Sequence, residues 1–523
     1  MKRKLFVFLV ACLALTFFTT FAFAGGGKEE AVEEEAPAEA AEIPWKKAPD
    51  VWGDEVNIMA LKATVSQPLF HFADIWEKER GRGTKVKITE VPIEAFHQKI
   101  FTDLITGMGQ YDAYLTATWF TGDYFSGDQY IYDIEQFMDD PQFPQWDPDT
   151  VVPAMKTLYS WAGKWVGVPN DNDGQVMYYR KDILTNKEYQ QRFKDEMGYD
   201  LPVPPKTTRQ FLDVAKFFNG WDWDNDGEKD YGVTMHLKVG AQGMFHYMSW
   251  AAPYVISDQN DRFWFNAETF EPLINSPGHV KALEDLTEMV QYGPEGMIGW
   301  TLGEAWDLFL KGDAVLTYTW GDLGSLAQDE EESVVKGKLG AAIMPGTTRA
   351  YDPIGDEWVE FDEPNRVGNT TGGSWHGVIS VYSDAPRATY DYLAFMAKKE
   401  NAFWNFTRGW TGVDPGRTFA FLEPHGTASV EDYEKQGWNA QDVREYTDAY
   451  WVNFTAEKQF PYLMIPGTNE YWRALDVEIN KVASGQKEAK EAMDDTYDKF
   501  QSITSRHGKE NQLRLFRQSF NLQ

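Results

Sequence analysis

Strand-like and helix-like segments alternate between residues 56 and 115, and this alternation limits the fold more than any other feature. Residues 56–59, 86–91 and 111–115 have the apolar and polar pattern of β-strands. Between them, residues 68–79 and 95–108 place their apolar side chains at helical spacing. Because a helix separates each strand from the next, we expect parallel strands joined by right-handed crossovers. The sequence therefore predicts the α/β fold class.

Aromatic and acidic side chains follow two of the predicted strands. In open α/β sheets, ligands lie beyond the carboxyl ends of the strands. Core packing is the alternative for each ring, because tryptophan is mostly buried wherever it lies. The candidates for ligand contact are Trp119, Phe120 and Asp123 after the third strand, and Trp320 and Asp322 after a later one at 314–319.

Residues 163–182, GKWVGVPNDNDGQVMYYRKD, set four small polar residues between two strand-like runs. A solvated turn is one interpretation, since Asn, Asp and Gly are common turn formers. The other is a chain that crosses a ligand cleft, where Asp171 and Asp173 accept charge-assisted hydrogen bonds from ligand hydroxyls. The residues alone leave both interpretations open.

The first 24 residues have the form of a cleaved secretory signal peptide. A basic start, MKRK, precedes an apolar stretch that ends in the small-x-small pattern Ala22-Phe23-Ala24. A membrane anchor is one alternative, because the stretch is just long enough to span a bilayer. Lipid anchoring at Cys12 is another. We predict a periplasmic protein that loses its single cysteine with the signal peptide and forms no disulfide.

Composition excludes some partners and favours others. Residues 25–52 are rich in Ala, Glu and Pro, which predicts a disordered acidic linker. The formal net charge of −32 argues against nucleic acids and anionic membranes, because both bind basic patches. The 21 Trp, 25 Tyr and 34 Phe residues suit a carbohydrate ligand, whose apolar C–H faces pack on aromatic rings. We expect a monomer without cofactors.

Several further motifs occur in an order that resembles the extracellular solute-binding proteins of ATP-binding-cassette importers, in the carbohydrate-binding group of the maltose-binding protein type. They run from about residue 56 to about residue 504: FTDLITGMGQYDAYL, GKWVGVP with YYRKDIL, PPKTTRQFLDVAKFF, FLKGDAVLTYTWGD, GGSWHGVIS and EINKVASGQKEAKEAMD. The resemblance implies two α/β lobes joined by several crossing segments, with the ligand held between them. It also implies a membrane permease as partner and no enzymatic activity.

The resemblance assigns further residues to the cleft. It places residues 170–173 where the chain crosses between lobes, and Asp173 at an acidic ligand contact of some sugar-binding relatives. Arg417 could donate two parallel hydrogen bonds to sugar oxygens or tie a loop. The other implied cleft residues are Gly373, Trp375, Tyr471 and Trp472.

The implied lobes are each built from two stretches of chain. Residues 53–172 form the first part of lobe 1, 173–320 the first part of lobe 2, 321–375 a return to lobe 1, and 376–523 the remainder of lobe 2 with the C-terminal helices. The chain is longer than most sugar binders. Its extra sequence, around residues 221–273 and 350–369, would reshape the cleft or decorate the lobes.

One acidic loop, DWDNDGEKDYG at residues 222–232, has the spacing of a calcium loop. Asp222, Asp224, Asp226 and Asp230 occupy candidate ligand positions. The twelfth position is Val233, where an EF-hand has a bidentate glutamate. We therefore predict a structural turn, with calcium binding as the alternative.

A secreted glycoside hydrolase is the main alternative function, since it would also place aromatics and paired carboxylates in a cleft. Within the importer class, the acidity leaves a binder of peptides or polyamines as another alternative. The order of the motifs and the aromatic content favour a receptor for a sugar or polyol.

Overall fold

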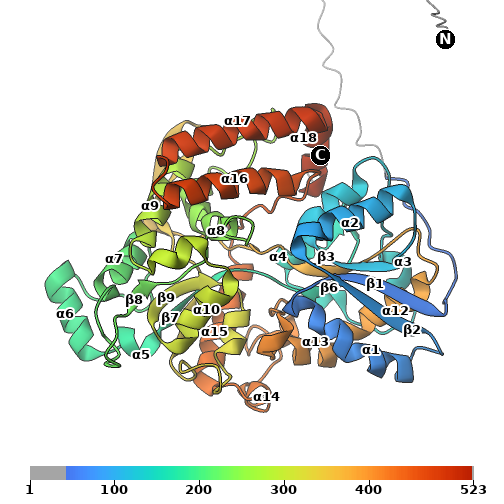
Figure 1. Ribbon diagram of the computed structural model, residues 1–523, viewed down its shortest axis with the longest axis horizontal. Coiled ribbons are helices and arrows are strands. Elements are labelled where there is room, and N and C mark those ends of the chain that lie inside the picture. Colours follow the sequence, from blue (N-terminus) through green and yellow to red (C-terminus); the bar gives the residue numbers. More distant parts are fainter. Residues whose placement is uncertain (1–42, 521–523) are drawn as a thin grey trace, which may run out of the picture. The chain divides into compact units, whose positions relative to one another are not determined.

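Two mixed β-sheets organise residues 43–520, the part of the chain that the computed structural model describes (Figure 1). The first sheet has the order β2-β1-β3-β13-β6. Its strands are β1 (Glu55–Leu61), β2 (Lys85–Val91), β3 (Ala113–Ala117), β13 (Trp375–Ile379) and β6 (Val168–Asp171). β1 pairs in parallel with β2 and β3, which confirms the predicted strand–helix–strand pattern, and β13 runs antiparallel to β3 and β6.

The crossover helices of the first sheet lie where the sequence predicts them. α1 (Gln67–Glu79) joins β1 to β2, and α2 (Ile93–Thr106) joins β2 to β3. α2 ends earlier than expected because Gly107, with φ of +64°, caps it in the left-handed conformation. α12 (Pro386–Met396) packs against α1 and β13.

β13 and α12 therefore lie with the first sheet, whereas the sequence prediction placed residues 376–523 with the second lobe. The pairing of β13 with β3 and β6 accounts for this difference, because it inserts a late segment of the chain into the early sheet. The other lobe boundaries stay a prediction.

The second sheet has the order β10-β7-β9-β8. Its strands are β10 (Leu339–Ala342), β7 (Val176–Arg180), β9 (Ala314–Thr319) and β8 (Tyr231–Val233). β7 runs antiparallel to β10 and β9, and β8 is parallel to β9. Because β6 belongs to the first sheet and β7 to the second, the chain crosses between the sheets at residues 172–175, within the polar stretch that the sequence singled out.

Helices cover the second sheet and extend beyond it. Thr207 and Gln210 form a capping box at the start of α7. α16 and α17 lie side by side and both pack against α9 (Figure 1). The longer helices here are α6 (Lys187–Met197), α7 (Thr208–Phe218), α8 (Met244–Val255), α9 (Pro277–Val290), α10 (Leu302–Lys311), α15 (Ala440–Phe454), α16 (Thr468–Ala483), α17 (Ala489–His507) and α18 (Lys509–Ser519).

Short elements complete the described chain. The extra sequence around residues 350–369 contributes to the hairpin of β11 (Thr347–Asp352) and β12 (Glu357–Asn365). The other short elements are α3 (Glu135–Met138), α4 (Pro153–Lys156), β4 (Ser160–Trp161), β5 (Lys164–Trp165), α5 (Lys181–Leu184), α11 (Asp322–Leu326), α13 (Lys399–Phe406) and α14 (Val430–Glu434).

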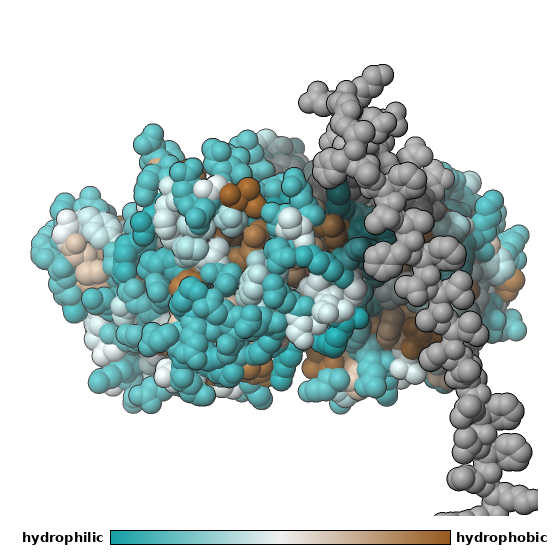
Figure 2. Space-filling view, turned by 90° about the horizontal axis from the view of Figure 1, so that it is seen from above, coloured by the Kyte–Doolittle hydropathy of each residue, from teal (hydrophilic) through white to brown (hydrophobic). Residues whose placement is uncertain are grey.

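The surface seen in Figure 2 is largely hydrophilic, with small separate hydrophobic areas, as the high content of acidic residues leads us to expect. Between residues 43 and 520, no helix combines the length and the apolar character needed to cross a bilayer. The predicted signal peptide, the alternative anchor at Cys12 and most of the predicted linker lie outside the described residues.

Candidate ligand-binding site

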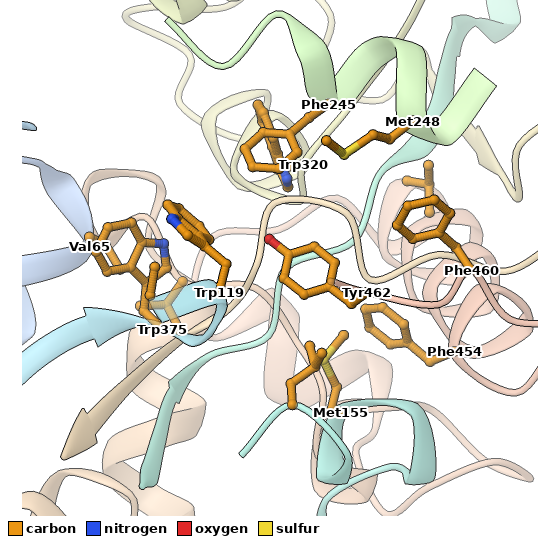
Figure 3. Close-up of a cluster of buried hydrophobic side chains, with 14 of the residues drawn as sticks. Val65, Trp119, Met155, Phe245, Met248, Trp320, Trp375, Phe454, Phe460 and Tyr462 are labelled. Atoms are coloured by element: carbon orange, nitrogen blue, oxygen red, sulfur yellow. The ribbon is translucent and has the colours of Figure 1, made fainter. Parts of the chain in front are cut away.

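Side chains from both sheets meet in a group of buried rings, which we call the aromatic cluster: Trp119, Phe245, Trp320, Trp375, Tyr462 and Trp472. Trp119 lies in a 3₁₀ helix (Thr118–Phe125) that follows β3, and Trp320 follows β9. The ring centroid of Trp119 is 5.9 Å from that of Phe245 and 5.6 Å from that of Trp472. The rings of Trp119, Phe245 and Trp320 lie near the Tyr462 hydroxyl in Figure 3. The strand ends of both lobes thus supply one cluster.

Several polar atoms of the aromatic cluster have no partner. The indole N–H groups of Trp119 and Trp472 and the hydroxyl of Tyr462 are buried and form no hydrogen bond among the described residues. The Trp320 indole differs, because it donates to the carbonyl of Thr371 at 2.7 Å. Leaving a buried donor unsatisfied costs about 1–3 kcal/mol. Three such donors in one cluster make it the candidate site for a polar ligand.

His236 adds an acceptor to these donors. Its ring centroid lies 5.8 Å from that of Trp320, and burial lowers its pKa to about 3, so the ring is neutral. The His236 backbone N–H donates to Nε2 of His246 at 3.4 Å, which makes that nitrogen an acceptor. His236 Nδ1, 3.0 Å from the same atom, must then carry the proton. His236 Nε2, buried and without a partner, is left as a free acceptor.

Two glycines let the chain pass between the rings. Gly372 and Gly373 have φ of +124° and +88°. A Cβ atom on Gly373 would lie 2.1 Å from both Cε3 of Trp119 and the hydroxyl of Tyr462. A Cβ atom on Gly372 would lie 1.9 Å from the Trp320 indole nitrogen. Only glycine fits here, which explains the Gly-Gly-Ser-Trp motif in structural terms.

We expect Gly373→Ala to lower the free energy of unfolding by more than about 2 kcal/mol. The left-handed backbone alone costs about 1–2 kcal/mol for alanine, and the contacts with Trp119 and Tyr462 add to it. Urea denaturation measures the change. Gly437→Ala is the matched control, since Gly437 has φ of +92° and its Cβ would meet nothing within 4 Å. Equal losses in the two variants would contradict the crowding at Gly373.

Carboxylates gather beside the aromatic cluster in what we call the acidic cluster: Asp171, Asp173 and Asp414. Each contributes one oxygen to a set of atoms that lie within 4.8 Å of one another. Burial raises the pKa of all three, and the charge of Asp322 at the start of α11 raises them further. Burial also raises the pKa of Asp322 to about 7. The two carboxylates of the polar stretch are therefore parts of a buried group rather than of a solvated turn.

Two other predicted residues, Asp123 and Phe120, lie in the helical turn after β3. Asp123 accepts a hydrogen bond from the Gly467 N–H at 3.2 Å and lies 2.8 Å from Nε2 of His97. It ties the helical turn after β3 to the start of α16. The Phe120 ring packs against Trp119 and His97, with centroids at 5.1 and 4.4 Å.

Arg417 and Tyr471 make no ring contact with the aromatic cluster. The Arg417 guanidinium donates to the carbonyl oxygens of Trp146, Asp147 and Ala397 and to the Thr150 hydroxyl. These hydrogen bonds hold a loop in place, which is one of the two roles that the sequence left open for Arg417. The Tyr471 hydroxyl pairs with that of Thr504 at 2.8 Å, between α16 and α17.

The acidic loop at residues 222–232 is held by its own backbone. Asp222 accepts from the N–H groups of Asn225 and Gly227, and Asp230 accepts from that of Trp223. Such bonds from a short acidic side chain to a nearby backbone are typical of a turn. Oxygens of Asp222, Asp224 and Asp230 also lie within 4.8 Å of one another, so the absence of a metal stays a prediction.

Sequence reasoning missed Phe245, Tyr462, His236 and Asp414. Phe245 and His236 lie in the extra sequence around 221–273, which therefore contributes to the site rather than only decorating the lobes. No local pattern marks Tyr462. A visible signal at Asp414 is the sequence Gly-Val-Asp-Pro-Gly, which is also typical of an ordinary turn.

Comparisons with known proteins agree with this architecture. Residues 72–436 match the family model described as bacterial extracellular solute-binding protein. A probable ABC transporter-binding protein of Deinococcus radiodurans is 22% identical over 333 residues, which cover 62% of this chain and 67% of that protein.

Solved structures share the fold at low sequence identity. An ABC transporter solute-binding protein of Agrobacterium radiobacter K84, in complex with ribitol, is 18% identical with a TM-score of 0.63, covering 87% of this chain and 99% of that one. The maltose-bound MalE3 of T. maritima is 16% identical with the same TM-score, covering 86% and 99%. At these sequence identities, both similarities show only that the fold is shared.

Proposed function

Because the chain belongs to the bacterial extracellular solute-binding protein family, we propose that it captures a sugar or polyol between its two lobes in the periplasm and delivers it to the permease of an ATP-binding-cassette importer. The observation that carries this proposal is the aromatic cluster with its unpartnered polar atoms. The ribitol and maltose bound by proteins of the same fold support the choice of ligand class.

The chemistry of the cluster fits a hydroxyl-rich ligand. The free groups are donors at Trp119 and Trp472, a donor or acceptor at Tyr462, and an acceptor at His236. A hydroxyl group both donates and accepts, so one kind of ligand group satisfies all of them. The C–H groups of a sugar or polyol chain pack against the faces of the surrounding rings. An amine lacks the acceptors that the indole N–H groups require.

Ligand capture would couple to closure of the lobes. Trp119 extends from the first sheet, while Phe245 and Trp320 belong to elements of the second. A ligand that touches both sets binds the closed form better than an open one, and only this difference in affinity drives closure. We propose that binding is the whole activity and that no bond of the ligand is broken.

A thermal-shift screen of sugars, polyols, amino acids, peptides and polyamines tests the proposed function. A ligand at a hundred times its dissociation constant stabilises the folded protein by about 2.7 kcal/mol, which raises the melting temperature by a few degrees. We expect that rise with a sugar or polyol. A rise with only peptides or polyamines would contradict the ligand class. Release of product from chromogenic glycosides would contradict the absence of catalysis and favour the hydrolase.

A further inference from the structure

Three segments deliver one carboxylate each to the acidic cluster. Asp171 ends β6 in the first sheet, and Asp173 lies on the crossing to β7 in the second. Asp414 comes from a loop far along the chain, yet its backbone N–H donates to Oδ1 of Asp171 at 2.7 Å. The cluster therefore lies on the chain crossing between the two sheets, and these three side chains are almost fully buried.

Backbone N–H groups hold one oxygen of each carboxylate, and the side chains of Asp171 and Asp173 also form a hydrogen bond with each other. Oδ1 of Asp171 accepts from Asn172 and Asp414, Oδ2 of Asp173 accepts from Ser374 at 3.0 Å, and Oδ2 of Asp414 accepts from Gly321 at 2.7 Å. Oδ1 of Asp414 is buried without any partner.

A neutral oxygen adjoins the same place. The hydroxyl of Tyr178, on β7, belongs to a fully buried side chain and lies near the Tyr450 hydroxyl and the backbone of Gly324, but it forms no hydrogen bond of good geometry. Among the charges that act on this hydroxyl, that of Asp414 is the strongest and that of Asp322 comes next. The unsatisfied hydroxyl and the free oxygen of Asp414 thus belong to one buried polar site.

No cationic side chain in the described residues compensates these carboxylates. The groups that act on Asp171, Asp173 and Asp414 are other carboxylates and hydrogen-bond donors, without a lysine, arginine or histidine. Arg417 is engaged with backbone carbonyls instead. Burying carboxylate charges without a partner is costly, and proteins either protonate such groups or pair them with a cation or a metal ion.

We propose that Asp171, Asp173 and Asp414 bind a divalent cation with a preference for oxygen ligands, Ca²⁺ before Mg²⁺. Calcium binds carboxylate oxygens at about 2.3–2.6 Å, so two of its ligands are at most about 5 Å apart. The 4.8 Å limit that contains the three oxygens fits this size. The cation would join β6, the crossing segment and the loop of Asp414, and so fix the connection between the sheets.

Calcium titration of the chelator-treated chain tests this site. Isothermal calorimetry and Tb³⁺ luminescence, excited through the neighbouring tyrosines, measure binding independently of any sugar. We expect binding that Asp414→Asn and Asp173→Asn each weaken at least about tenfold, because affinity follows the number of charged ligands. Asn keeps the size of the side chain, and the melting temperature in chelator confirms that each variant folds.

Asp224→Asn is the matched control, because Asp224 belongs to the second group of carboxylates, in the loop at 222–232. Calcium binding that survives Asp224→Asn and is lost in Asp414→Asn supports the proposal. Binding that is lost only in Asp224→Asn would place the cation in that loop and overturn it. No binding of Ca²⁺, Mg²⁺ or Tb³⁺ to the wild-type chain would also overturn it and show that the acidic cluster holds protons.

Discussion

Trp119→Ala is expected to weaken binding of the sugar or polyol at least about 100-fold. The substitution removes both the ring face and the free N–H at the centre of the aromatic cluster, where Trp119 contacts Phe245, Trp375 and Trp472. A buried aromatic anchor contributes 2 kcal/mol or more to binding, and about 2.7 kcal/mol corresponds to 100-fold. Calorimetric titration with the ligand found by the screen measures the loss.

Trp119→Phe separates the two contributions. It keeps a ring but removes the N–H, so we expect a loss of about tenfold, the value of one hydrogen bond of about 1.4 kcal/mol. Trp410→Ala is the control, because Trp410 is 48% exposed and belongs to no part of the site. Unchanged affinity in Trp119→Ala would show that the aromatic cluster is core packing only.

Asp391→Ala is expected to lower the free energy of unfolding by about 3 kcal/mol. The carboxylate of Asp391, on α12, is fully buried and accepts from the indole of Trp76 on α1 at 2.8 Å and from Nε of Arg80, the C-cap of α1, at 2.7 Å. Removing one partner of a buried ion pair typically costs 3–5 kcal/mol, and the partly exposed Arg80 places this pair at the lower end.

Chemical denaturation measures this loss, with Glu196→Ala as control. Glu196 pairs with Arg192 on the surface of α6, where an exposed ion pair contributes less than about 1 kcal/mol. If Asp391→Ala lowered the free energy of unfolding by as little as Glu196→Ala does, α12 would not be firmly joined to α1. That result would contradict the position of α12 beside the first sheet.

The local pattern of the sequence was enough to predict much of the fold. The alternation over residues 56–115 predicts three strands and two helices because each depends on side-chain periods of two or 3.6 residues. The crossing near residues 170–173 follows from the family resemblance. The place of β13 in the first sheet does not follow from the sequence. Its pairing with β3 joins residues more than 250 positions apart, and such a pairing produces no periodic pattern in the sequence.

The site was predictable only in part for the same reason. Trp119 and Trp320 follow strands, and strand ends are where α/β proteins place ligands, so the rule finds them. Tyr462 and Asp414 reach the site only through tertiary packing. Arg417 shows the limit of residue type, which suits both sugar recognition and a loop tie, because its hydrogen bonds to backbone carbonyls appear only in the folded chain.

Calorimetric titration of the purified chain with the sugar or polyol from the screen tests the central claim most directly. We predict one ligand per chain and a negative heat-capacity change, because the rings of the aromatic cluster bury the apolar face of the ligand. The same titration of Trp119→Ala should give no measurable heat at the same concentrations. Binding of equal strength in both proteins, or binding of a polyamine or peptide in place of every sugar and polyol, would contradict the account.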